Sequence, residues 1–213
     1  MNSIGLPAQG TIAVPEIPNS VGRPVDFARG GRDYVNSVDL MHAAPVSLDD
    51  AGFRFRFFSI VESPGIWVRA GAIADKENAK AEVRLDRENG PESFYFVCPD
   101  DGAALAKVDD FKFEFDSSGY VIEDQILTGP LQGEFEFWPQ LIEAIRYAGS
   151  VVYPGMVWFV VSISGNAECL GPVIDGAELR LDIRRALGQR NMVPFSTSTG
   201  AKGRIITLQN PDD

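Results

Sequence analysis

The chain has 213 residues, of which 45% are hydrophobic and 23% are charged, and its formal net charge is −11. This length suits one well-buried core, and the balance of apolar and charged residues excludes wholesale disorder. An acidic chain without a cluster of lysines and arginines repels phosphate backbones, so we expect no nucleic-acid partner.

Neither a signal peptide nor a membrane span is evident. The first ten residues lack the basic and apolar segments of a secretory signal, and the longest apolar run, 156–163, is too short to cross a bilayer. We therefore expect a cytoplasmic protein with no membrane partner, although a mature form that had lost its leader would look the same. Cys98 and Cys169 are the only cysteines, and we expect two reduced, buried thiols rather than a disulfide.

Residues 1–50 differ in composition from the rest of the chain. They contain five prolines, which favour extended backbone at the preceding residue. They also contain apolar residues, such as Ile12, Val25 and Phe27, that a solvated tail would not need. We predict an extended arm over 1–50, packed on the domain 51–213 or on a neighbouring subunit, with a short strand over 34–41.

The segment 53–74 is the predicted centre of the fold. Phe53, Phe55 and Phe57 alternate with arginines, which is the period of a strand with one buried face. Ser63-Pro64-Gly65 is typical of a tight turn. The pattern predicts a hairpin whose second strand runs over 66–74, with Phe55 buried.

Further elements follow from the same periodicities. A helix is predicted over 139–148, because apolar residues recur on one stripe, Pro139 lies in the first turn and Gly149 follows the end. The strand 156–164 is apolar on both faces, which is typical of a central strand or of one that covers a subunit interface. A hairpin through Ser117-Ser118-Gly119 would bury Phe113. The remaining predicted strands cover 80–86, 94–98, 111–116, 120–126, 134–137, 177–184 and 204–209.

These elements predict an all-β, mainly antiparallel fold: a β-barrel or β-sandwich of about nine to ten strands, with one amphipathic helix and an extended N-terminal arm. No internal repeat of fixed period is evident. The small residues Ala70, Gly71 and Ala72 indicate either an apolar cavity inside a barrel or a depression that receives the helix.

The candidate catalytic residues are His42, Tyr34, Glu62 and Arg69. His42 is the only histidine, and its side chain suits proton transfer near neutral pH. Asp39 or Tyr34 would orient it. Glu62 lies at a predicted strand end, across the predicted hairpin from Arg69, where a paired carboxylate is a second acid–base candidate. An exposed ion pair is the alternative interpretation.

No cofactor or metal is predicted. One histidine and no closely spaced cysteines exclude the usual His/Cys metal site. Acidic doublets such as Asp100-Asp101 lack the ligand spacing of a calcium loop, and residues 196–205 lack the spacing of a phosphate-binding loop.

Two functions of different classes are consistent with the sequence. The first is a small-molecule-binding β-barrel protein that isomerises or cyclises an apolar or aromatic substrate without a cofactor. The second is a structural or assembly protein whose arm and apolar strand form subunit contacts without catalysis. We expect self-association, with a dimer favoured, because the arm is too rich in Pro and Gly to fold alone and too apolar to remain solvated.

Overall fold

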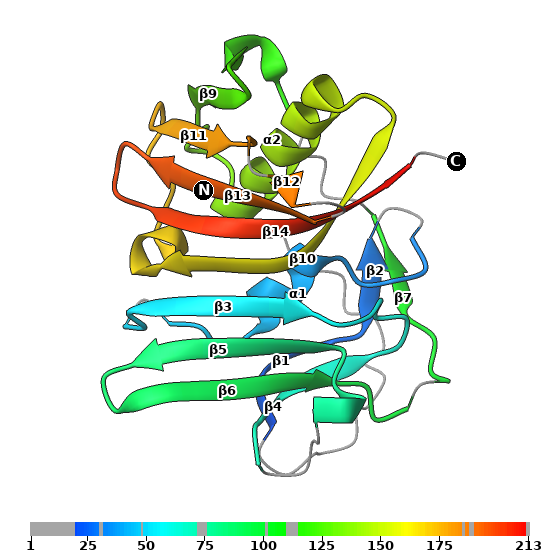
Figure 1. Ribbon diagram of the computed structural model, residues 1–213. Coiled ribbons are helices and arrows are strands. Elements are labelled where there is room, and N and C mark those ends of the chain that lie inside the picture. The colour runs from blue at the N-terminus through cyan, green and yellow to red at the C-terminus, as the bar shows by residue number, and fades with distance from the viewer. Residues whose placement is uncertain are drawn as a thin grey trace.

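A single curved sheet, mostly antiparallel, forms most of the protein (Figure 1). The computed structural model describes residues 20–29, 32–47, 49–71, 76–100, 102–109, 115–184, 186–187 and 190–211. The predicted all-β, antiparallel class is confirmed at this level. The sheet ends at β1 (Ser20–Val25) and at β8 (Val121–Glu123) and is not closed into a barrel, and two α-helices accompany it instead of one.

The sheet consists of two consecutive units whose strand orders are similar but not identical. With the five main strands of each unit numbered along the chain, the spatial order is 1-3-5-4-2 in the first unit and 1-3-4-5-2 in the second. In both units a helix lies between the first and second of these strands. The first unit contains β1, α1 (Ser37–Ala43), β3 (Gly52–Phe57), β4 (Gly65–Arg69), β5 (Ala81–Arg87) and β6 (Gly90–Val97). The second contains β9 (Ile126–Pro130), α2 (Phe137–Val152), β10 (Met156–Asn166), β11 (Glu178–Asp182), β13 (Arg190–Thr197) and β14 (Lys202–Pro211). The units also differ in the lengths of their helices, which have 7 and 16 residues.

Smaller elements complete the described chain. The strand β8 pairs with β9, and β12 (Ala186–Leu187) pairs with β13. A separate parallel pair joins β2 (Phe27–Arg29) to β7 (Ala106–Val108). Short 3₁₀ turns lie at Lys76–Asn78, Ser117–Gly119 and Ala167–Leu170.

The two units join edge to edge through β3 and β10. Five residue pairs align antiparallel, from Ser162 opposite Arg56 to Asn166 opposite Gly52. The hydroxyl of Ser162 also donates a hydrogen bond of 2.7 Å to the carbonyl of Phe55. The rings of Phe53 and Trp138 meet edge to face, with centroids 5.4 Å apart. The units therefore share one sheet and one continuous apolar core.

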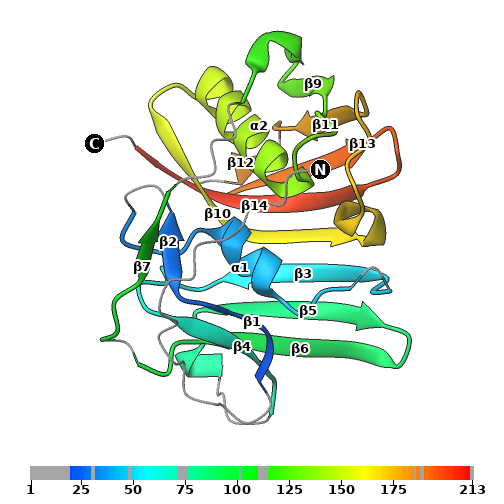
Figure 2. The same cartoon turned by 180° about the vertical axis from the view of Figure 1, so that it is seen from behind.

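Both helices lie on the same face of the sheet, behind it in Figure 1 and in front of it in Figure 2. The predicted helix is confirmed and is longer than expected, because Phe137 and Trp138 are already helical. The prediction of a strand over 34–41 is wrong: the side chain of Asn36 caps α1 by accepting from the backbone N–H of Asp39. None of the described helices is long and apolar enough to cross a membrane.

The predicted hairpin over 53–74 is wrong, although both of its strands exist. The strand β4 pairs with β1 and β6, whereas β3 pairs with β5 and β10. The linking segment leaves the sheet, and the backbone N–H of Val35 donates to the carbonyl of Val61 at 2.8 Å. Since β4 ends at Arg69, Ala70 and Gly71 form a turn at its end. Ala70 and Gly71 therefore form no depression within a strand, and Ala72 lies outside the described residues.

Most of the other predicted strands are present in the structure. The strands near 80–86, 94–98, 156–164, 177–184 and 204–209 are confirmed. The strand over 134–137 is wrong, because these residues form a turn and the start of α2, and β9 and β13 were not predicted. The segment 110–114, with Phe113, lies outside the described residues. Of the predicted arm, residues 20–25 pair with β4 of their own chain, and a contact with another subunit stays a prediction.

Candidate functional site

His42 contacts a carboxylate that belongs to the other unit. Its Nε2 lies 3.1 Å from Oε2 of Glu136. His42 occupies the last turn of α1, and Glu136 is the residue immediately before α2. The contact therefore joins the end of one helix to the beginning of the other. The side chains are 39% and 68% exposed, respectively, so a molecule from solvent can reach both.

The electrostatics of the two helix ends favour this pair. A helix C-terminus stabilises a cation and a helix N-terminus stabilises an anion, because the unpaired carbonyl and N–H groups carry partial charges. The Glu136 side chain makes no hydrogen bond to the α2 backbone. It is therefore available to His42.

The buried side chain of Gln140 holds Glu136 in place. Its Nε2 lies 3.0, 3.1 and 3.2 Å from the carbonyl oxygens of Gln132, Phe135 and Glu136, to which it donates. Its Oε1 accepts from the backbone N–H of Gln132 at 2.7 Å. One side-chain amide thus satisfies several backbone groups of the turn before α2, and these hydrogen bonds fix the backbone that carries Glu136.

Packing fixes the other half of the pair. The indole N–H of Trp67, which is fully buried, donates to the carbonyl of Leu40 at 3.1 Å. On β1, the strand that pairs with the strand of Trp67, a Cβ at Gly22 would approach the carbonyl oxygen of Ala43 to 2.3 Å. Only glycine allows β1 to run this close to the end of α1. His42 is therefore carried by a helix that packs closely on two adjacent strands, β1 and β4.

Asp39 does not orient His42. It accepts a hydrogen bond of 2.8 Å from Nε of Arg29 and is buried, so it links α1 to β2. Val35 and Val61 form an antiparallel bridge, and Tyr34 and Glu62, the residues next to them in sequence, lie on the same side of this bridge. Both are exposed, and no contact between either of them and His42 is recorded. The structure thus groups Tyr34 with Glu62 but leaves His42 apart from both.

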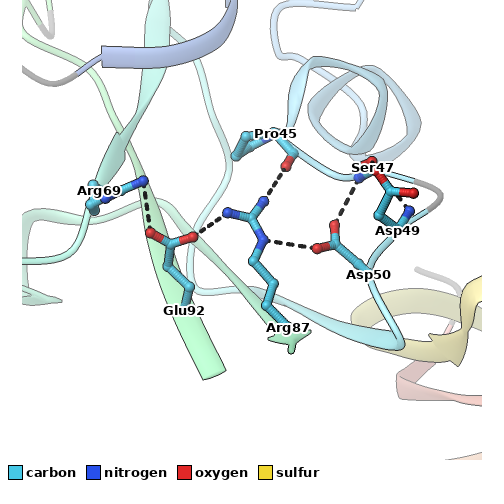
Figure 3. Close-up of polar contacts among 7 residues, drawn as sticks. All are labelled: Pro45, Ser47, Asp49, Asp50, Arg69, Arg87 and Glu92. Carbon is cyan, nitrogen blue, oxygen red and sulfur yellow. Dashed lines mark hydrogen bonds and ion pairs between the residues drawn. The ribbon is translucent and has the colours of Figure 1, made fainter. Parts of the chain in front are cut away.

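Arg69 belongs to a separate polar network (Figure 3). Its Nη2 lies 2.8 Å from Oε1 of Glu92, whose other oxygen binds Arg87. Arg87 also donates to Oδ1 of Asp50 at 2.8 Å and to the carbonyl of Pro45 at 3.1 Å. The hydrogen bond to Asp50 raises the pKa of Arg87 above its ordinary value. This network fastens the segment after α1 to β5 and β6, and we assign it a structural role.

Among the described residues of the second unit, three polar side chains are buried without hydrogen-bond partners. They are Asn191, Thr207 and the indole N–H of Trp158. Asn191 and Thr207 lie directly opposite each other on β13 and β14. Each such group costs about 1–3 kcal/mol unless water or a ligand satisfies it. The sequence pattern predicted a strand over 204–209 but none at Asn191, and the pair was therefore missed.

The two thiols are not joined by a disulfide. Cys169 is buried, and burial raises the pKa of its thiol to about 11, whereas Cys98 is half-buried. Among the described residues, no group of three or more His, Cys, Asp or Glu side chains could hold a metal ion.

Sequence reasoning identified His42 but missed Glu136 and Gln140. It assigned 134–137 to a strand, in which Glu136 would be one exposed residue of an alternating pattern. The available signal was the position of Glu136 immediately before an apolar helical stripe, where acidic residues are favoured.

Comparison with known proteins gives distant structural likenesses only. No family model matches the chain, and no curated protein matches it. A tesB protein of Mycobacterium avium subspecies paratuberculosis has 9% identity and a TM-score of 0.43, covering 88% of this chain and 92% of that one. A protein of unknown function with a hot dog fold, from Alicyclobacillus acidocaldarius, has 6% identity and a TM-score of 0.35, covering 81% and 83%. The dehydratase domain of the CurF module of curacin polyketide synthase has 10% identity and a TM-score of 0.38, covering 84% and 82%. At these identities and TM-scores, the likenesses decide neither the family nor the activity of this chain.

Proposed function

We propose that the protein is an enzyme that acts on a small molecule and uses His42 and Glu136 as a general acid–base pair. The proposal rests on one observation, the 3.1 Å contact between Nε2 of His42 and Oε2 of Glu136. A carboxylate beside an imidazole orients the ring and stabilises the imidazolium that forms when the ring takes up a proton. Both groups are accessible, as proton transfer to a bound molecule requires.

The reaction class that suits this pair is proton transfer at a carbon next to a carbonyl group. Isomerisation, cyclisation and elimination of water all begin with this step. We propose an apolar or aromatic substrate, as the sequence led us to expect. No group beyond the imidazole and the carboxylate is needed to move the proton.

Proton exchange tests the proposal without knowledge of the product. A panel of ketones and acyl thioesters is incubated with the protein in deuterated water, and loss of the α-proton signals is followed by NMR. The wild-type protein should accelerate exchange in at least one member. His42→Gln and Glu136→Gln should each reduce that rate by about 10² or more, because general acid–base catalysis contributes factors of this size.

Glu134→Gln is the matched control, since Glu134 is an exposed acid two residues before Glu136. It should exchange protons at the wild-type rate. Equal rates in wild type and His42→Gln for every active compound would rule out the proposed role of the pair.

A second candidate function is assembly, because large apolar side chains remain exposed. Phe58, Ile60 and Phe159 are 42%, 62% and 50% exposed, respectively, as expected for a surface that self-associates. Light scattering at several concentrations would test it. A dimer that Phe159→Ser converts to a monomer supports assembly, whereas a wild-type monomer at all concentrations excludes it.

A further inference from the structure

Three arginines form a row across the centre of the sheet. Arg54 on β3 lies directly opposite Arg84 on β5, and on its other side it lies opposite Ser164 on β10. Ser164 in turn lies opposite Arg204 on β14. The neighbours of Arg54 along β3, Phe53 and Phe55, are buried in the core. The row therefore lies on the face away from the helices, which is the front of the sheet in Figure 1.

Among the described residues, these arginines have no acidic partner. In the part of the chain that the structure describes, Arg54, Arg84 and Arg204 form neither an ion pair nor a side-chain hydrogen bond. Arg56, two residues further along β3, does pair, with its Nη1 3.4 Å from Oε2 of Glu82. Like charges directly opposite each other in a sheet are destabilising. The row thus keeps three positive charges together on a chain that carries 30 acidic residues.

A groove of about 700 Å³ follows this row. Its lining includes all three arginines, and it also includes Lys202, Ser164 and the single carboxylate of Asp86. Four cations and one anion leave a local charge of +3, opposite in sign to the net charge of the whole chain. Ser164 adds a hydroxyl donor between Arg54 and Arg204.

We propose that this groove binds the phosphate groups of a small organic phosphate. A guanidinium donates two parallel hydrogen bonds to a phosphate and stays charged at all relevant pH values. Neighbouring strands are about 4.8 Å apart, so Arg54 and Arg84 are close enough to share one phosphate. Arg204 lies two strands from Arg54, about 10 Å away, where it and Lys202 meet a second phosphate or the distal part of the ligand.

The surrounding charge selects a compact ligand over a nucleic acid. Long polyanions extend over the rest of the surface, where a net charge of −11 repels them. A small phosphate ester contacts only the groove. This site is separate from the His42–Glu136 pair, since α1 and α2 cover the opposite face of the sheet.

Isothermal titration of the full chain with sodium pyrophosphate tests the proposal, at low ionic strength and again at about 150 mM salt. Wild type should bind one pyrophosphate per chain. Arg54→Gln and Arg84→Gln should each weaken binding about tenfold or more, and Arg204→Gln should weaken it less. Arg56→Gln is the matched control, because it removes the same charge from the same strand and face, and it should retain wild-type affinity within about twofold.

Three results would overturn the proposal. The first is wild type that fails to bind pyrophosphate. The second is an equal loss in Arg56→Gln and Arg54→Gln, which would reduce the effect to general surface charge. The third is binding of a single-stranded oligonucleotide but not of pyrophosphate, which would assign the groove to a nucleic acid. Circular dichroism and light scattering on each variant verify the native fold and an unchanged mass. If the wild-type protein does not bind pyrophosphate and an arginine variant changes the mass of the particle, the groove is a contact between copies of the chain.

Discussion

Cys169 shows how one buried side chain imposes a pH dependence on the whole fold. It lies in the 3₁₀ turn after β10, and its Sγ donates to Oδ1 of Asn166 at 3.3 Å and to the carbonyl of Lys202 at 3.6 Å. Both contacts come from the thiol form. Burial is the main cause that raises its pKa from 9.0 to about 11.

This shift predicts a loss of stability in alkali. The unfolded chain releases the thiol proton near pH 9, whereas the folded chain holds it to about pH 11. Between these values the unfolded state binds fewer protons, so the free energy of unfolding falls as the pH rises. The protonated thiol makes its full contribution to the free energy of unfolding below pH 9, and on the order of 2–3 kcal/mol of that contribution is lost by pH 11. Urea denaturation at pH 8 to 11 measures it.

In Cys169→Ala, the free energy of unfolding should fall less steeply between pH 9 and pH 11 than in wild type, because the buried thiol is absent. Tyrosines and lysines titrate in both proteins, so their effect cancels in the comparison. Cys98→Ala is the control and should keep the wild-type slope. Identical slopes in wild type and Cys169→Ala would show that the thiol titrates alike in both states.

At the scale of elements, the start of α2 depends on Gln140. This side chain is 1% exposed and makes four hydrogen bonds to the preceding turn. Gln140→Leu keeps a similar volume but leaves the backbone groups of that turn unpaired. We expect a loss of about 1–3 kcal/mol in the free energy of unfolding, measured by urea denaturation.

The same substitution should also reduce the α-proton exchange rate, because the backbone that positions Glu136 is released. Glu143→Gln lies one turn further along α2 and removes only an exposed pair with Arg146. It should cost less than about 1 kcal/mol and leave exchange unchanged. Equal stability in both variants would refute the role of Gln140.

The elements also show how far the sequence could predict the fold. Local alternation located β3, with its buried Phe53 and Phe55, and the stripe on α2 located that helix. Pairing between strands depends on contacts distant in the chain, so the hairpin over 53–74 failed even though both strands exist. The helix α1 has only seven residues, too few for a clear period, and the Asn36 cap was not recognised. His42 stood out as the only histidine. Its partner Glu136 was missed because residues 134–137 were assigned to a strand, so the predicted helix began too late to show Glu136 at its start.

At the scale of the whole molecule, the shared sheet predicts a single cooperative transition. Trp67 reports on the first unit, and Trp138 and Trp158 report on the second. Phe55 is 1% exposed and packs against Trp67, with ring centroids 6.1 Å apart. Phe55→Ala should lower the free energy of unfolding by about 3–5 kcal/mol through the cavity that it leaves. It should do so in one transition by both fluorescence and far-UV circular dichroism.

Arg56→Ala is the control, because Arg56 is the next residue of β3 and lies on the opposite, solvent-facing side of the strand. Its side chain is 44% exposed, so the loss should stay below about 1 kcal/mol. Two separate transitions in Phe55→Ala, with only one affected, would mean that the units fold independently.

The seam between β3 and β10 has a consequence for stoichiometry. If each unit were a separate chain, pairing between their edge strands would make a dimer that dissociates on dilution. A dimer of two identical chains would also contain two copies of each site. A single chain replaces that association by an intramolecular contact at high effective concentration, so the seam persists at any dilution. It also frees the two halves to diverge. The first half supplies the imidazole of His42 and the second half the carboxylate of Glu136, so one chain contains this contact once.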